Sequence, residues 1–206
     1  MDRLDQALQS AGPLLRRVDE VIATVGAPPD HRVWAELRRV RLLPTDAVHA
    51  VAALRPAELT EVATELRADA RTYAGVAAAL PGPQDWTGDA ADSYHAARNR
   101  TAVHLGGGPE SLEERLDATA DLVEALHEWM DHTRCDLAAA LAEILTSAQA
   151  LDLPIESEPD PTADRTILAA ADIAARLLHG VAESYATAAD LIEASAELTG
   201  VRYQRA

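Results

Sequence analysis

The chain has 206 residues and a formal net charge of −16 at neutral pH. This length accommodates one large or two small domains, and the charge argues against nucleic acid and anionic membrane surfaces as primary partners. Apolar residues make up 48% of the chain, but aromatic residues only 3%, and Phe is absent. Alanine and leucine therefore supply most of the core, which favours closely packed helices over a β-sheet.

Cysteine content and the start of the chain exclude further classes of protein. Cys135 is the only cysteine, so the chain has no intrachain disulfide and no cysteine-based zinc site. No apolar h-region follows the first residues, and no run of 18 apolar residues occurs. We therefore expect neither a cleavable secretory signal nor a membrane span. All 18 basic residues are Arg, a bias that indicates a GC-rich genome such as an actinobacterial one.

Charge is distributed unevenly along the chain. Residues 1–109 contain 12 Arg and 14 acidic residues, a net charge of −2, whereas residues 110–206 contain 6 Arg and 20 acidic residues, a net charge of −14. We expect the second half to remain exposed to solvent, while the first half is able to dock an acidic partner.

The N-terminal segment, residues 1–54, has apolar residues at helical spacing. Pro13 is expected to kink the first helix, which ends before Gly26. Pro29 fits the first turn of a second helix with Trp34, Leu37, Val40 and Leu43 on one side, and Thr45 fits the cap of a third. The expected helices span residues 2–25, 29–43 and 46–54.

The middle region, residues 55–152, has a seven-residue repeat on both sides of a central break. Before the break, the repeat consists of Leu59, Leu66, Tyr73 and Leu80. A helix is expected over 88–105. The sequence Gly-Gly-Gly-Pro over 106–109 then breaks the helical pattern. The repeat then continues in a second stretch that we interpret as an interaction seam for helix packing: Leu116, Val123, Met130, Leu137, Ile144 and Leu151.

The C-terminal segment, residues 153–206, starts with an acidic, proline-rich loop over 153–161. Thr162 fits the cap of a last helix over 163–200, which would pack on the same bundle. Two long helices joined by a short loop lie antiparallel. The predicted fold is all-α, an elongated helical bundle built from long antiparallel helical hairpins.

A Trp-x-Gly motif separates two of the expected helices. Trp86 and Gly88 lie in a break rich in Pro and Gly, and Ala90, Ala91 and Tyr94 follow in the next helix. This arrangement resembles the WXG family of type VII secretion proteins, and the resemblance covers residues 55–152. It implies a helical hairpin that is exported without a cleavable signal and acts through helix–helix contacts. The partner would be another WXG-type chain, the secretion machine or a second copy of the chain.

Two departures from the family pattern leave an alternative open. The family's export signal, Tyr-x-x-x-Asp/Glu, does not occur, because Ala189 lies four residues after Tyr185 and Asp190 is one position too far. The chain is also about twice as long as small members of the family. The resemblance implies a secreted or cell-envelope protein, whereas a cytoplasmic helical adaptor or chaperone is the alternative.

No enzymatic site is predicted. His127 and His132 are five residues apart, about 140° around a helix, so they do not share a metal as in an HExxH motif. Glu124 and His127 match one half of a di-iron pattern, but no second half occurs. We predict no enzyme activity, no metal and no cofactor.

A basic cluster surrounds Trp34. It has two interpretations, a solvated helix face or a docking patch for an acidic partner, which includes the chain's own C-terminal half. The cluster consists of Arg32, Arg38, Arg39 and Arg41.

Overall fold

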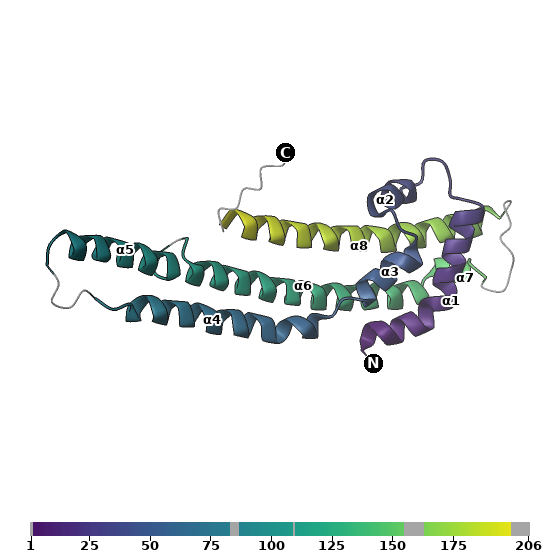
Figure 1. The fold of residues 1–206 in the computed structure, drawn as a ribbon. Coiled ribbons are helices and arrows are strands. Elements are labelled where there is room, and N and C mark those ends of the chain that lie inside the picture. The colour runs from purple at the N-terminus through teal and green to yellow at the C-terminus, as the bar shows by residue number, and fades with distance from the viewer. Residues whose placement is uncertain (1, 83–86, 109, 155–162, 199–206) are drawn as a thin grey trace. The chain divides into compact units, whose positions relative to one another are not determined.

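The computed structural model of the chain describes residues 2–82, 87–108, 110–154 and 163–198 (Figure 1). Within these ranges every regular element is a helix and none is a strand, so the prediction of an all-α helical bundle is confirmed. No helix in this part of the chain is long and apolar enough to cross a bilayer. The elements are α1 (Arg3–Thr24), α2 (Val33–Val40), α3 (Pro44–Ala52), the 3-10 helix η1 (Pro56–Leu59), α4 (Thr60–Ala79), α5 (Asp89–Leu105), α6 (Leu112–Leu145), α7 (Ala148–Leu151) and α8 (Asp164–Leu198).

The chain forms two compact units, each built from two separate stretches of sequence. The core unit comprises Met1–Arg55 and Trp129–Ala188, and the hairpin unit comprises Pro56–Glu128 and Ala189–Ala206. One boundary between these units lies between Arg55 and Pro56, at the start of η1. The other boundaries fall within α6 and α8, so both long helices contribute to both units.

Helix α1 begins with a reciprocal capping box. The Asp5 amide donates to the Asp2 carboxylate at 2.9 Å, and the Asp2 amide donates to the Asp5 carboxylate at 3.3 Å. These bonds satisfy amides that have no partner within the helix. Pro13 lies inside α1, where it removes a backbone hydrogen bond, and Figure 1 shows that α1 bends along its length.

The second and third helices begin at residues other than those predicted. Helix α2 starts at Val33 and not at Pro29, because the preceding residues form a turn in which the Pro28 carbonyl accepts the indole N–H of Trp34 at 2.9 Å. Helix α3 starts at Pro44, a favourable first helical residue. Thr45 is not its cap. Its amide donates to the carboxylate of Asp19 on α1 instead, at 3.3 Å.

The core unit surrounds a continuous aliphatic core. Helices α1, α2 and α3, the C-terminal half of α6 and most of α8 contribute to it. Four side chains that were predicted to share one side of the second helix pack against this core. They are Trp34, Leu37, Val40 and Leu43. Its largest fully buried side chains are Leu4, Leu15, Val18, Val21, Val33, Val48, Val51, Leu141, Ile144, Leu153, Leu177 and Leu178.

The hairpin unit packs through alanine. Helix α4 runs beside α5 and the start of α6 (Figure 1), and its buried residues are Ala63 and Ala70. In the repeat of Leu59, Leu66, Tyr73 and Leu80, Tyr73 is 39% exposed and the other three side chains are half-buried. Alanine occupies the buried line because small side chains let helix backbones approach closely.

The long heptad helix ends before its predicted last residue. Helix α6 stops at Leu145, where the Thr146 hydroxyl donates to the Ala142 and Glu143 carbonyls. Ser147 then caps the separate helix α7. Leu151 lies on α7 and is 87% exposed, while nearby Leu153 is buried in its place. A Thr-Ser pair that bonds to the backbone interrupts the periodicity on which the prediction relied.

Candidate functional site

The turn of the hairpin unit contains the predicted motif. Trp86 lies outside the described residues, as does Thr162, the predicted cap of the last helix. Gly88 precedes α5 with φ 95° and ψ −175°, a conformation that residues with a side chain rarely adopt. The Tyr94 hydroxyl donates to the Pro81 carbonyl and the Arg98 Nε donates to the Leu80 carbonyl, both at 2.9 Å. Two side chains of α5 therefore bond to carbonyls at the end of α4. The last carbonyls of a helix have no hydrogen-bond partner within the helix, so these bonds satisfy them.

The glycine break after α5 is a site of close packing. A Cβ atom on Gly106 would lie 3.1 Å from the Cα of Ala74 on α4 and 2.8 Å from the Glu113 carboxylate. That carboxylate accepts the amide of Gly107 at 2.9 Å, and the buried Ser111 caps the start of α6 by accepting the Glu114 amide at 3.3 Å. The chain therefore changes from α5 to α6 at this break, and both helices pack against α4.

The interaction seam changes character along α6. Leu116 and Val123 are half-buried in the hairpin unit, and Met130 is half-buried in the core unit. Leu137 and Ile144 are buried in the aliphatic core, and Leu151 is exposed on α7. The last three positions therefore do not offer a continuous apolar seam to a partner chain.

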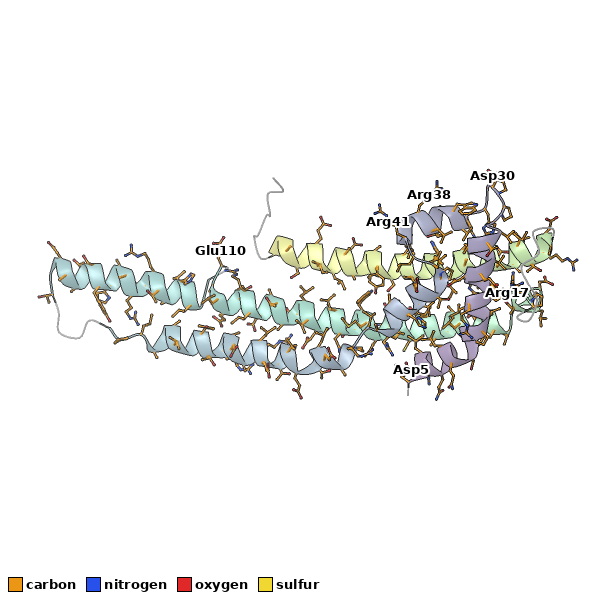
Figure 2. All side chains as sticks on the ribbon, turned by 45° about the vertical axis from the view of Figure 1, so that its right-hand side comes forward. Asp5, Arg17, Asp30, Arg38, Arg41 and Glu110 are labelled. Carbon is orange, nitrogen blue, oxygen red and sulfur yellow. The ribbon has the colours of Figure 1, made fainter. Side chains whose placement is uncertain are left out.

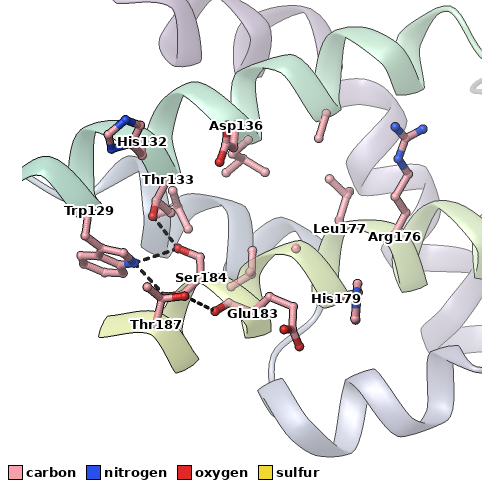
Figure 3. Close-up of a pocket in the computed structure, with 15 residues that line it drawn as sticks. Trp129, His132, Thr133, Asp136, Arg176, Leu177, His179, Glu183, Ser184 and Thr187 are labelled. Atoms are coloured by element: carbon pink, nitrogen blue, oxygen red, sulfur yellow. Dashed lines mark hydrogen bonds between the residues drawn. The ribbon is translucent and has the colours of Figure 1, made fainter. Parts of the chain in front are cut away.

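A groove between α6 and α8 in the core unit is organised by Trp129 (Figure 3). The groove has a volume of about 530 Å³. The Trp129 indole N–H donates to the Ser184 carbonyl at 2.7 Å, and the hydroxyls of Thr133 and Ser184 are hydrogen-bonded to each other. Tyr185 contacts Trp129 edge to face, with ring centroids 5.4 Å apart. These contacts use the polar groups of the groove to join two helices.

The serine of the groove, Ser184, takes part in the hydrogen bonds between the two helices. Ser184 Oγ lies 3.0 Å from the Trp129 indole nitrogen and is bonded to the Thr133 hydroxyl. Among the described residues, no three His, Cys, Asp or Glu side chains come close enough to hold a metal ion. His127 bonds through Nδ1 to the Pro56 carbonyl at 2.8 Å, which places it in the packing of α6 against the chain before α4.

The basic cluster divides into two pairs. Arg39 binds the Glu183 carboxylate at 2.6 Å, and Arg32 lies 3.7 Å from the Asp172 carboxylate, both on α8. These two arginines therefore dock on the chain's own C-terminal half. Arg38 and Arg41 are exposed and have no acidic partner in the described part of the chain. The predicted four-residue patch therefore reduces to two arginines that can meet a partner.

Two histidines reinforce the contact that α8 makes with α2 and with the turn before it. His31 Nε2 lies 3.3 Å from the Asp172 carboxylate, and His179 Nδ1 lies 3.0 Å from the Glu36 carboxylate. Together with the two arginine pairs, they place acidic and basic groups alternately along one contact. The two arginine pairs bring opposite charges together at this contact.

Arginine side chains shift the pKa values of the carboxylates that they bind. Hydrogen bonds from Arg134 lower the pKa of Asp2, and Arg39 lowers that of Glu183 in the same way. Arg67 on α4 bonds Glu124 and Asp121 on α6, which lowers the pKa of Glu124. Burial has the opposite effect on Asp19, whose pKa is raised.

Comparisons with family models, curated proteins and solved structures gave no match for the chain. The functional interpretation therefore depends on the motif and on the geometry of the two units.

The roles of Trp129, Tyr185 and Arg134 were not predicted from the sequence. Arg134 donates to the Ala52 carbonyl at 2.6 Å and binds Asp2, so it joins α6 to the end of α3 and the start of α1. One signal was present: Trp129 and Arg134 are large polar-tipped residues in a helix rich in Ala and Leu. Such residues tend to find a hydrogen-bond partner when they are partly buried.

Proposed function

We propose that the chain is a WXG-type helical hairpin protein without enzymatic activity, which acts through helix–helix contacts as a substrate, effector or partner in type VII secretion. The observation that carries this proposal is the hairpin of α4 with α5 and α6, in which Gly88, the glycine of the Trp-x-Gly sequence motif, precedes α5 with a positive φ. Tyr94 supports it, since the residue that follows the motif by about two helical turns bonds back across the same turn.

Exposed apolar residues on the hairpin unit support a role in helix–helix contacts. Val76 on α4 and Val103 on α5 are 47% and 61% exposed, and Tyr73 on α4 is also exposed. Apolar side chains at helical spacing on an exposed hairpin are suited to packing against a partner helix. The alanine packing within the hairpin leaves these larger side chains outside.

Export is the decisive measurement. The protein is tagged at its C-terminus, and culture filtrate is compared with lysate in host cells whose type VII machine is intact or disabled. A cytoplasmic marker protein controls for lysis. Machine-dependent protein in the filtrate is the expected result. Protein found only in the lysate would overturn secretion and favour the alternative of a cytoplasmic adaptor.

A glycine pair tests the role of the turn in the same assay. Gly88→Ala forces a side chain into a positive-φ conformation, which costs about 1 kcal/mol or more, and we expect export to fall. Gly75→Ala is the matched control, because Gly75 lies within α4 where an added Cβ meets no atom within 4 Å. Alanine should stabilise α4 there by about 0.5–1 kcal/mol. Equal export of both variants would argue against a role for the turn.

A further inference from the structure

A second groove lies within the hairpin unit, between the N-terminal part of α6 and the C-terminal end of α8. Its volume is about 360 Å³, and all of its lining residues belong to the hairpin unit. Leu122 on α6 and Leu191 on α8 are half-buried, so a partner is able to cover the rest of their apolar surface. The apolar lining consists of Ala118, Leu122, Ala125, Leu191 and Ala194.

One edge of this groove is acidic, and we call it the acidic groove. Glu114, Asp117 and Asp121 line it from α6, and their spacing of three and four residues places them on one side of the helix. Ala118 follows Glu114 by four residues, and Ala125 follows Asp121 by four. The acidic stripe of α6 therefore runs directly beside its apolar stripe.

The carboxylates of the acidic groove are only partly neutralised within the hairpin unit. Asp121 pairs with Arg67 on α4 at 2.7 Å, but Arg67 also bonds Glu124, so one positive charge serves two carboxylates. Glu114 and Asp117 make no ion pair in the described part of the chain. Negative charge therefore remains at the edge of an apolar surface.

The net charge of the acidic groove favours a basic occupant from another protein. Three carboxylates and Arg115 give its lining a net charge of −2, which attracts basic side chains. The basic helix α2 of a second copy does not fit. Arg38 and Arg41 project outward from α2 and its end (Figure 2), but Leu37 and Val40 pack against the core. The apolar side of α2 is therefore already covered.

We propose that the acidic groove binds a basic amphipathic helix of a partner protein. Apolar side chains of that helix lie in the groove, and its Arg or Lys side chains pair with Glu114 and Asp117. Amphipathic helices bind grooves in this way through apolar residues spaced three or four apart. The inference is separate from export, because it concerns the binding of a helix by the purified chain.

Fluorescence anisotropy of a labelled synthetic peptide, titrated with the full chain, tests the proposal. The peptide is an alanine-based helix with leucine at the spacing i, i+4, i+7 and i+11 and arginine on both flanks of the leucine face. A second peptide has the same composition in shuffled order, and a third has glutamate in place of arginine. We expect saturable binding of the first peptide alone, weakened by salt because the acidic edge is exposed.

The double variant E114K/D117K tests the acidic edge. It should raise the dissociation constant of the arginine peptide about tenfold, because attraction becomes repulsion at two positions. The same variant should bind the glutamate peptide better than the wild type does. The matched control is E61K/E65K, which makes the same charge change at two exposed positions of α4 outside the groove and should leave binding nearly unchanged.

A pair of tryptophan variants tests the apolar surface. Ala194 is exposed and lines the groove, so Ala194→Trp fills it without displacing a buried side chain. We expect binding of the arginine peptide to fall about tenfold or more. Ala189→Trp is the control, since Ala189 is exposed on the same helix about 140° around its axis. Circular dichroism confirms that all variants remain helical.

Four outcomes would overturn the proposal. They are the absence of saturable binding, equal binding of the three peptides, an unchanged affinity in E114K/D117K, and equal effects of the two tryptophan variants. The variant R202A/R205A adds a fifth, because the last residues of the chain contain two arginines. If this variant binds the arginine peptide much more tightly than the wild type does, the chain's own C-terminal residues occupy the groove and not a partner.

Discussion

The two units bury different residues, although both are built from helices of similar composition. In the core unit the fully buried side chains include large Leu, Ile and Val residues from five helices. In the hairpin unit the buried described residues are Ala63, Ala70, Ala91 and Ala120, together with Ser111. Each alanine removes much less apolar surface from water than a leucine does. The core unit therefore depends on a shared core, while the hairpin unit depends on close contact between helices.

This difference in packing predicts a difference in tolerance. Removing volume should damage the core unit, because a cavity forms where large side chains met. Adding volume should damage the hairpin unit, because its helices are already in close approach.

The largest expected effect is that of Leu178→Ala in the core unit. Leu178 is fully buried, so its truncation should lower the free energy of unfolding by about 2–5 kcal/mol. Denaturant unfolding followed by tryptophan fluorescence measures this change, since Trp34 and Trp129 both belong to the core unit. Leu168→Ala is the matched control: Leu168 is exposed on the same helix, and we expect a much smaller loss. Equal losses would contradict a single aliphatic core.

The opposite change tests the hairpin unit. Ala70→Leu adds volume at a buried position of α4, and we expect a loss of about 1–3 kcal/mol from overpacking. Ala68→Leu adds the same volume at an exposed position of the same helix and should be nearly neutral. Thermal unfolding followed by circular dichroism compares the two. A neutral Ala70→Leu would mean that α4 is not closely packed.

The link between α6 and α8 is tested by Trp129→Phe. This change removes the indole N–H that donates to the Ser184 carbonyl, and it should cost about 1–2 kcal/mol. Tyr185→Phe retains the edge-to-face ring contact and serves as the control, with a smaller expected effect. If Trp129→Phe unfolds at the same denaturant concentration as the wild type, the hydrogen bond does not stabilise the core unit.

The smallest expected effects are those of pH, and they have opposite signs at two aspartates of the core unit. Arg134 lowers the pKa of Asp2 below 3.8, so its contribution to stability is present above pH 3.8 and is lost as pH falls through the lowered pKa. Burial raises the pKa of Asp19, so its ionisation costs stability as pH rises from 3.8 through the raised pKa.

Unfolding midpoints measured as a function of pH check both signs. Asp2→Asn should reduce the acid-induced loss of stability below pH 3.8. Asp19→Asn keeps an oxygen able to accept the Thr45 amide and should gain relative to the wild type as pH rises above 3.8. Parallel pH profiles for the wild type and both variants would contradict the assigned pKa shifts.

The sequence predicted local structure well where local signals were strong. Pro and Gly place the ends of most helices, and the first helix, the helix after Gly88 and the last helix begin within about two residues of prediction. Predictions failed where a side chain outside the expected pattern bonded to the backbone at the start of a helix. Asp19 takes the place of the expected Thr45 cap of α3, and a bond from Trp34 to Pro28 delays the start of α2.

The candidate surfaces depended more on tertiary structure. The sequence does not distinguish the four arginines near Trp34. In the structure, Arg32 and Arg39 pair with acidic residues of α8, about 140 residues later. Arg38 and Arg41 meet no acidic residue in the described part of the chain. A heptad pattern likewise treats Leu137 and Leu151 alike, although one is buried and the other is exposed. Sequence spacing reports which residues share a helix face but not what covers that face.

The sequence by itself therefore determined the all-α class, most of the helices and the motif on which the proposed function depends, because helix propensity, breakers and periodicity act over a few residues. Only the tertiary structure decided that two units share the long helices, that alanine packs one unit and leucine the other, and which charges are paired. Those outcomes depend on contacts between residues far apart in the chain, whose partners no local pattern specifies.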